Sequence, residues 1–119
     1  TIRRNLSLSP LGEKIELRIG DAKEILPTLQ GSLFDLVFID ADKREYCTYL
    51  DLVYPLVPIG GWLIADNTLW DGHIIDHAYD KDKQTLGLRA FNDHLAQDPR
   101  FEQVILPIRD GLTIIHKIR

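Results

Sequence analysis

The stretch LFDLVFIDADK, residues 33–43, decides the fold of this chain. Residues 33–39 are mostly apolar, which is typical of a strand that is covered on both faces of a sheet. The apolar run ends at Asp40, and apolar residues then recur at helical spacing to about Val57, which predicts an amphipathic helix. A buried strand followed by an amphipathic helix is the unit from which parallel α/β sheets are assembled.

Further strands and helices flank this unit on both sides. Lys14–Ile19 alternates apolar and polar residues with period two, which indicates a half-buried strand. A short helix is expected over Ala22–Leu29, with Asp21 as its N-cap. Trp62–Ala65 is another short apolar strand, and a helix is expected over about Lys83–Gln97, ending shortly before a proline.

The final strands, Phe101–Pro107 and Leu112–Ile118, are joined by a hairpin-like connection with Asp110-Gly111 as the turn. The complete order is therefore β-α-β-α-β-α-β-β. This alternation predicts an α/β fold with a mostly parallel sheet, to which the terminal hairpin adds an antiparallel edge. In such sheets ligands bind at the carboxyl ends of the strands, and polar residues follow two of the predicted strands at that edge.

Composition and charge exclude several classes of function. With 119 residues the chain is long enough for one domain and too short for two. No apolar run approaches the roughly 18 residues that span a bilayer, and no signal-peptide pattern is present, so we expect a cytoplasmic protein without a membrane partner. The formal charge of −4 argues against binding to nucleic acid, and the single Cys47 excludes a disulfide framework. Because the chain begins at Thr1 and contains no methionine, we expect that an N-terminal segment has been removed or left out.

The residues at the two strand ends have the chemistry of a metal site. Asp40, Asp66 and Asn67 offer two carboxylates and an amide oxygen, an all-oxygen set that suits magnesium, calcium or manganese. Adjacent strands lie roughly 4.8 Å apart, so side chains at neighbouring strand ends can share one ion. Asp and Asn are also favoured helix N-caps, and from these residues alone both interpretations stay open.

Lys43 lies three residues beyond Asp40, in the first turn of the predicted helix. The helix dipole disfavours a cation at that position. Close to a bound cation and partly desolvated, the lysine would have a lowered pKa and could act as a general base. A solvated surface lysine is the alternative.

Three motifs occur in a fixed order: FDLVFIDADK at residues 34–43 with Tyr46 shortly after, Gly60-Gly61 followed by DNTLW at residues 66–70, and LPIRDGLT at residues 106–113. Together they resemble the caffeoyl-CoA-type, cation-dependent O-methyltransferases of the class I S-adenosylmethionine-using family, with catechol O-methyltransferase as a more distant relative. The resemblance runs from about Lys14 to the C-terminus. It implies the C-terminal part of a Rossmann-like class I methyltransferase sheet.

The resemblance implies a reaction and assigns residues to it. A methyl group would pass from S-adenosylmethionine to one hydroxyl of a catechol-like vicinal diol, and a divalent cation would bind both hydroxyls. Asp40, Asp66 and Asn67 match the metal ligands, and Asp40 would also touch the substrate and the cofactor. Lys43 matches the base that accepts the hydroxyl proton.

The resemblance also implies contacts to the cofactor and to the acceptor. Ala22 matches a backbone contact to the adenine ring, and Asp42 matches a residue that lines the cofactor site. Trp70 and Asp71 fall where the family contacts the acceptor, but Asp71 stands where an asparagine is expected, which leaves the acceptor's identity open. Asp110 matches an acid that faces the metal-bound diol, and it is equally well explained as a turn residue before a glycine.

Full-length members of this family have further N-terminal helices and two further strands, which lie between the strand matching Lys14–Ile19 and the strand matching 33–39. The first of these two strands ends in a Gly-rich loop for the cofactor, and no such loop is found here. The resemblance therefore implies that residues 1–119 are a single incomplete methyltransferase domain that by itself binds the cofactor weakly or not at all. Members of the family are commonly homodimers, so a homodimer is expected.

Two other classes of protein compete with this interpretation. A receiver-type phosphoacceptor module also has a strand that ends in an aspartate, here Asp40, but it needs an acidic pair after its first strand, which is absent. A non-catalytic methyltransferase fragment would keep the fold without the activity. Methyl transfer that depends on a metal would exclude both.

Overall fold

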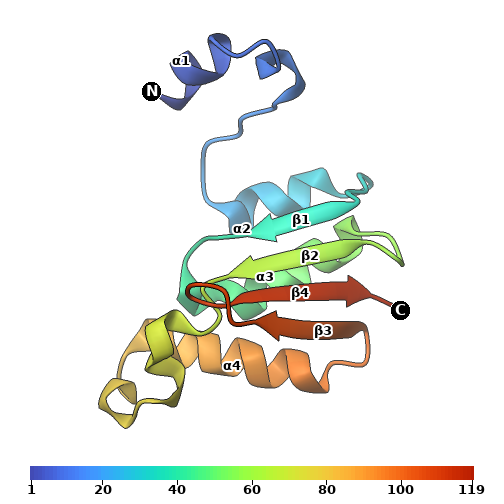
Figure 1. Ribbon diagram of the computed structural model, residues 1–119. Coiled ribbons are helices and arrows are strands. Elements are labelled where there is room, and N and C mark those ends of the chain that lie inside the picture. The colour runs from blue at the N-terminus through green and yellow to red at the C-terminus, as the bar shows by residue number, and fades with distance from the viewer.

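The computed structural model describes residues 1–119 as a four-stranded sheet with helices on one face and an N-terminal arm that extends away from the sheet (Figure 1). The strands are β1 (Leu36–Ile39), β2 (Trp62–Asp66), β3 (Phe101–Leu106) and β4 (Leu112–Lys117), in the spatial order β1-β2-β4-β3. β1 pairs in parallel with β2, whereas β4 is antiparallel to both of its neighbours. Three strands therefore point in one direction and only β4 is reversed, which confirms the predicted α/β class.

Three helices cover one face of this sheet: α2 (Ala22–Ile25), α3 (Tyr46–Val53) and α4 (Lys83–Gln97). A single core lies between α3, α4 and the sheet, and residues of α2 pack against its edge. Its fully or almost fully buried members include Tyr46, Leu50, Leu63, Ala65, Leu88, Phe91, Leu95 and Ile115. The strand residues in this core alternate along β2 and β4, as the two-residue period of a strand requires.

The opposite face of the sheet carries no helix and is largely apolar. We call it the open face, and it is formed by Leu36, Phe38, Trp62, Val104 and Ile114, which the strand register places side by side. Phe38 is 58% exposed and Trp62 is 44% exposed. The Trp62 ring stacks on the ring of His116 at a centroid distance of 4.2 Å, which covers only part of the indole. A sheet with parallel strands is normally covered on both faces, so this exposure is unusual.

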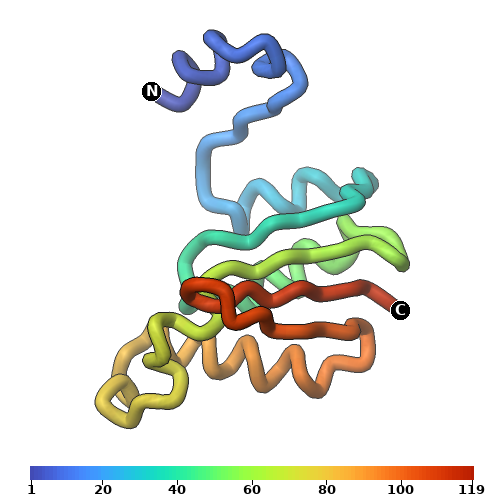
Figure 2. Tube along the Cα trace, in the orientation of Figure 1, coloured from blue at the N-terminus to red at the C-terminus, as the bar shows by residue number.

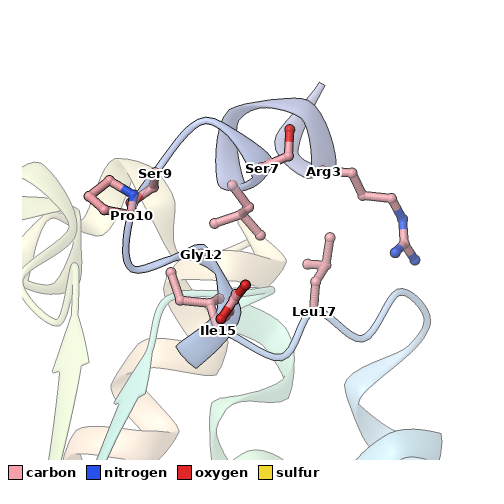
Figure 3. A pocket seen from close by; sticks show the side chains of 9 residues that line it. Arg3, Ser7, Ser9, Pro10, Gly12, Ile15 and Leu17 are labelled. Atoms are coloured by element: carbon pink, nitrogen blue, oxygen red, sulfur yellow. The ribbon is translucent and has the colours of Figure 1, made fainter.

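The N-terminal arm, residues 1–20, projects from the sheet and does not fold back onto it (Figure 2). It consists of α1 (Ile2–Ser7), a single 3-10 turn over Gly12–Lys14 and an extended segment. α1 and the extended segment enclose a shallow cavity between themselves (Figure 3). Gly12 approaches the Leu6 carbonyl so closely that a Cβ atom there would lie 2.0 Å from the carbonyl oxygen, so only glycine fits this turn.

The predicted strand over Lys14–Ile19 is wrong. These residues begin in the 3-10 turn and continue as extended chain without strand pairing. The alternating pattern is real, but a strand also requires a neighbour for its backbone hydrogen bonds. β1 pairs only with β2, and no strand lies beside the extended segment. Ile15 and Ile19 are accordingly exposed.

The remaining elements agree with the sequence except at their ends. α4 has the predicted bounds because Asp82 caps its first turn, accepting hydrogen bonds from the backbone N–H and the hydroxyl of Thr85. The helix predicted to run to about Val57 is divided into a 3-10 turn over Lys43–Glu45, then α3, then a 3-10 turn over Tyr54–Leu56 that contains a proline. The final hairpin is present, but β4 inserts between β2 and β3, so the reversed strand is interior and not at the edge. None of the helices has the length and apolar character needed to cross a membrane.

Candidate functional site

The carboxyl ends of β1 and β2 lie side by side, as the parallel pairing of Ile39 with Ala65 requires. Asp40 follows β1 directly and Asp66 is the last residue of β2. The hydroxyl of Tyr46, a fully buried residue, joins the two strand ends. It lies 2.8 Å from the carbonyl oxygen of Asp66, to which it donates, and 3.3 Å from that of Ile39. A single buried side chain on α3 thereby fixes the spacing of both strand ends.

Lys43 is buried beside these strand ends, with a side chain that is only 8% exposed. Its Nζ donates to Asp40 Oδ1 at 2.9 Å and to the Tyr46 hydroxyl at 3.0 Å. It also lies over the rings of Tyr46 and Trp70, at 5.1 Å and 5.9 Å from their centroids. Lys43 is therefore a desolvated cation between a carboxylate and two aromatic faces, and not the solvated surface lysine of the alternative interpretation.

The arrangement raises the pKa of Lys43 above its ordinary value. Burial lowers the pKa of this ammonium, but the hydrogen bonds and charges of Tyr46 and Asp40 outweigh the burial. The ammonium form is therefore the stable one in this arrangement. The lowered pKa expected from the sequence was stated for a lysine close to a bound cation, and it stays a prediction.

A polar cavity of about 410 Å³ opens next to the end of β2, and we call it the acidic cleft. It is lined by Asp66, Asn67, Asp71, Arg109 and Asp110. The Asn67 side-chain amide donates to Asp110 Oδ2 at 3.2 Å, and its backbone N–H donates to Asp66 Oδ1 at 2.7 Å. Three carboxylates, one amide and one guanidinium from two stretches of the chain, residues 66–71 and 109–110, therefore face one cavity.

The backbone around the acidic cleft is strained. Four non-glycine residues have left-handed conformations: Asn67, Trp70, Asp71 and Arg109, with φ values between 48° and 63°. No other non-glycine residue of the chain does so, and three of the four line the cleft. Each such residue costs on the order of 1–3 kcal/mol, and conformations of this kind cluster at functional sites. Here they are held by hydrogen bonds from the N–H groups of residues 68–70 to the carbonyls of Asp110 and Gly111.

The three predicted metal ligands are not brought to one cavity. Asp66 and Asn67 line the acidic cleft, whereas Asp40 lines a different cavity and its carboxylate is bound by Lys43. No cluster of three or more His, Cys, Asp or Glu side chains is arranged to hold a metal ion. The predicted roles of these residues stay predictions.

The predicted cofactor residues are divided in a similar way. Ala22 and Asp40 line one cavity of about 200 Å³, which is almost entirely apolar and also contains Tyr49. Asp42 does not line it. Its carboxylate caps the following 3-10 turn and binds Arg44, whose Nε lies 2.9 Å from Asp42 Oδ1. These contacts lower the pKa of Asp42 to about 2, chiefly through the Arg44 side chain.

Among the predicted acceptor residues, Asp71 and Asp110 line the acidic cleft and Trp70 packs over Lys43 nearby.

Two residues of the site were missed from the sequence. Arg109 lines the cleft, and nothing in its sequence context distinguishes it from a turn residue. Tyr46 is predicted only as part of the first family motif, although its place about one helical turn after Lys43 is a signal that the two side chains meet.

Comparison with known proteins agrees with the motifs. A family model described as O-methyltransferase matches residues 3–118. The chain belongs to this O-methyltransferase family. It is 40% identical over 121 residues to a caffeoyl-CoA O-methyltransferase from Petroselinum crispum, covering 91% of this chain and 49% of the relative. The chain thus spans about half the length of the curated relatives that it matches.

Solved structures of O-methyltransferases share the fold of this family member. The O-methyltransferase TomG from Streptomyces achromogenes, in complex with SAM, superposes with a TM-score of 0.90 at 26% identity, covering 98% of this chain and 56% of TomG. The O-methyltransferase from Bacillus cereus, in complex with SAH, gives a TM-score of 0.88 at 28% identity, covering 97% of this chain and 56% of that protein. These matches confirm the resemblance and do not favour the receiver-type alternative.

Proposed function

We propose that the protein containing this chain is an S-adenosylmethionine-dependent O-methyltransferase that methylates a catechol-like aromatic diol with the help of a divalent cation. One observation carries the proposal: a desolvated lysine, Lys43, lies between Asp40 and the end of β2, next to a strained cleft that holds three carboxylates. Strained backbone and perturbed ionisable groups cluster at functional sites, which supports the proposal. The relatives support the cofactor and the reaction, because TomG is bound to SAM and the Petroselinum protein is a caffeoyl-CoA O-methyltransferase.

The donor groups near the strand ends have the chemistry that a hard divalent cation needs. Asp66 and Asn67 present carboxylate and amide oxygens to one cavity, together with Asp110, and oxygen ligands suit magnesium, calcium or manganese. We assign Asp66, Asn67 and Asp40 as the residues that would hold the cation. Such an ion lowers the pKa of a bound hydroxyl and orients a diol.

Lys43 is the proposed base, but in the present arrangement it carries a proton. It can accept the acceptor's proton only after the Asp40 carboxylate has moved away from its Nζ. That movement would remove one of the hydrogen bonds that raise the pKa of Lys43, while burial would continue to lower it. Asp40 is therefore both a proposed ligand and, with Tyr46, one of the two groups whose hydrogen bonds raise the pKa of the proposed base.

The proposed acceptor position is the acidic cleft, with Asp71 and Asp110 facing the diol and Trp70 at its edge. The apolar cavity beside β1, lined by Ala22, is the proposed position of the adenine end of the cofactor. Asp42, which the resemblance assigns to the cofactor site, does not line this cavity, and its carboxylate is bound by Arg44.

The deciding experiment follows a labelled methyl group from S-adenosylmethionine to a panel of catechols and non-aromatic diols. The complete gene product that contains this chain is assayed with Mg²⁺ and with a chelator. We expect a methylated catechol with Mg²⁺ and none with the chelator. Activity that the chelator leaves unchanged would contradict the metal assignment, and the absence of product with every diol would contradict the activity.

Two variants locate the metal. Asp66→Asn should lower kcat/KM and weaken Mn²⁺ binding, which is measured by isothermal titration calorimetry. Loss of a contact in a metal's outer shell typically costs roughly 10–100-fold, and each of these two effects should be at least that large. Asp93→Asn removes the same charge from an exposed position on α4 and should change neither quantity. If both variants bind Mn²⁺ like the unchanged protein, the ion is not held by Asp66.

A further inference from the structure

Residues 70–80 form a loop that leaves the acidic cleft after Asp71 and returns to the start of α4, and we call it the cleft loop. It contains two 3-10 segments, Trp70–Ile75 and His77–Tyr79. Trp70 and Ile74 pack against the core, but the outer part of the loop has little apolar anchorage, since Ile75 is 84% exposed. Something other than hydrophobic packing must therefore hold the outer part in place.

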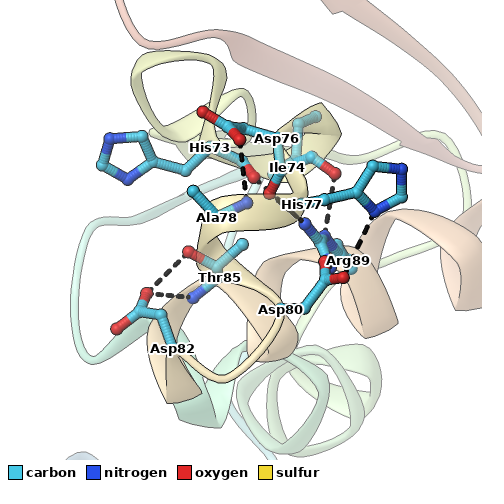
Figure 4. Close-up of polar contacts among 9 residues, drawn as sticks. All are labelled: His73, Ile74, Asp76, His77, Ala78, Asp80, Asp82, Thr85 and Arg89. Atoms are coloured by element: carbon cyan, nitrogen blue, oxygen red, sulfur yellow. Dashed lines mark hydrogen bonds and ion pairs between the residues drawn. The ribbon is translucent and has the colours of Figure 1, made fainter.

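Arg89, on α4, supplies that attachment (Figure 4). Its Nε donates to the carbonyl of Ile74 at 2.8 Å, and its Nη2 donates to the carbonyls of His73 and Asp76 at 3.2 Å and 3.0 Å. Its Nη1 donates to Asp80 Oδ1 at 2.8 Å. One guanidinium thus binds three backbone carbonyls and one carboxylate, all of them in the cleft loop.

The charge and shape of arginine suit this position. The planar guanidinium presents several N–H donors in a fixed arrangement, which a lysine ammonium cannot reproduce. Asp80 also accepts from the Nδ1 of His77 when that nitrogen carries a proton, and both the Arg89 and the His77 contacts lower the pKa of Asp80. Arg89 itself is held by α4, a helix of 15 residues whose inner face is part of the core. The loop is therefore attached to the longest helix of the chain.

We infer that Arg89 is a positioning residue for the acidic cleft: by binding the outer part of the cleft loop to α4, it keeps Trp70 and the cleft-lining Asp71 in their strained, left-handed conformations. The left-handed backbone of these two residues is unfavourable by itself and relaxes if the loop is released. Arg89 touches no residue that lines the cleft, so it acts only through the loop. The expected consequence for methyl transfer rests on the proposed function, whereas the consequence for the loop does not.

Amide hydrogen exchange of the 119-residue chain tests the inference directly. In Arg89→Met, exchange should become at least tenfold faster in the outer loop, at Asp76 and Tyr79. It should also become at least tenfold faster on the cleft side, at Trp70 and Gly72, whose N–H groups donate to Asp110 and Leu69. Amides in the middle of α4 should keep their protection. Unchanged exchange at Trp70 and Gly72, or an equal increase throughout α4, would overturn the inference.

Three further variants sharpen the test. Lys83→Met removes a cation from an exposed position of the same helix and should leave the loop unchanged. Arg89→Lys should not restore protection, because charge alone does not replace the four contacts, and full protection in this variant would overturn the inference. If Arg89→Met does not fold, Asp80→Asn weakens the carboxylate contacts to Arg89 and His77 and keeps the three carbonyl contacts of Arg89. It should accelerate exchange about threefold on both sides of the loop, and no change there would also overturn the inference.

The catalytic consequence is measured on the complete gene product. Arg89→Lys should raise the acceptor KM at least fivefold and leave the KM for S-adenosylmethionine unchanged, whereas Lys83→Met should alter neither. Equal increases in both KM values would indicate a general structural defect and would contradict a positioning role. If the unchanged enzyme methylates no diol, the proposed function fails, and the exchange measurements still decide the role of Arg89.

Discussion

The Tyr46 hydroxyl offers the sharpest test of how the site is built. Tyr46→Phe removes one oxygen atom and keeps the ring, so the edge-to-face contact with Phe91 at 5.3 Å is preserved. The change deprives the Asp66 carbonyl of its donor and the Lys43 ammonium of one of its two hydrogen-bond partners. Because the hydroxyl is fully buried, no bulk water replaces it.

The expected cost follows from these two losses. A buried carbonyl left without a donor costs about 1–3 kcal/mol, and the lost hydrogen bond to a charged group is worth about 1.5–3 kcal/mol. Since the two losses share one hydroxyl and part of the strain can relax, we take about 3 kcal/mol for Tyr46→Phe. With a urea slope of about 1.5 kcal/mol per M for a domain of this size, the midpoint falls by about 2 M.

Urea unfolding followed by far-ultraviolet circular dichroism measures this shift. The control is Tyr54→Phe, which removes a hydroxyl that donates to the Arg119 carbonyl at an exposed position. Its expected cost is below about 0.5 kcal/mol. NMR titration adds a second measurement, because the pKa of Lys43 should fall when one of the hydrogen bonds that raise it is removed.

Equal midpoints for Tyr46→Phe and Tyr54→Phe would refute the reasoning, because the buried hydroxyl would then contribute no more than an exposed one. A large shift in the urea midpoint with an unchanged Lys43 pKa would refute the part of the reasoning that concerns Lys43. In that case the hydroxyl would stabilise the strand ends without acting on the lysine.

Two further predictions follow from contacts described above. The carboxyl of Asp42 should titrate near pH 2 in a carbon-detected NMR titration, and its pKa should return toward the ordinary value of 3.8 in Arg44→Met. Because the pKa of Asp42 is lowered on folding, the stability that this group contributes is present above pH 3.8 and is lost as the pH falls through about 2. An unshifted titration would contradict the ion pair. Gly111→Ala should lower the free energy of unfolding by more than about 2 kcal/mol, because φ is +84° and the new Cβ would lie 2.7 Å from the Leu69 backbone nitrogen. The control Gly60→Ala, with φ +89° and no atom within 4 Å of the new Cβ, should cost only about 1 kcal/mol. Equal costs for the two variants in thermal unfolding would show that the contact with Leu69 is not restrictive.

Local signals predicted most of the architecture. The bounds of α4 are fixed by an aspartate that caps its start and by the Asp-Pro pair after its end, and both features are visible in the sequence. The polar residues after the apolar strands correctly indicated the edge of the sheet where the cleft lies, because the carboxyl ends of parallel strands share one edge.

The failures depend on which groups come into contact, and local patterns do not report that. Lys14–Ile19 has the pattern of a strand but lacks a neighbour, and no local signal reports a missing neighbour. The contact of Lys43 with Asp40, only three residues away, was not foreseen because it depends on a side-chain rotamer that periodicity does not encode. Arg89 was overlooked for a similar reason, since its four partners lie 9 to 16 residues away along the chain and are mostly carbonyl groups, which are the same for every residue type.

The open face places two demands on the same side chains. In water, a sheet surface that exposes Phe38 and Trp62 promotes association and limits the concentration at which the chain stays dispersed. Replacing Phe38 and Trp62 with charged residues would reduce this tendency to associate, but it would also prevent any second layer of polypeptide from covering the sheet. The two aromatic side chains therefore favour a covered sheet at the expense of dispersion in water.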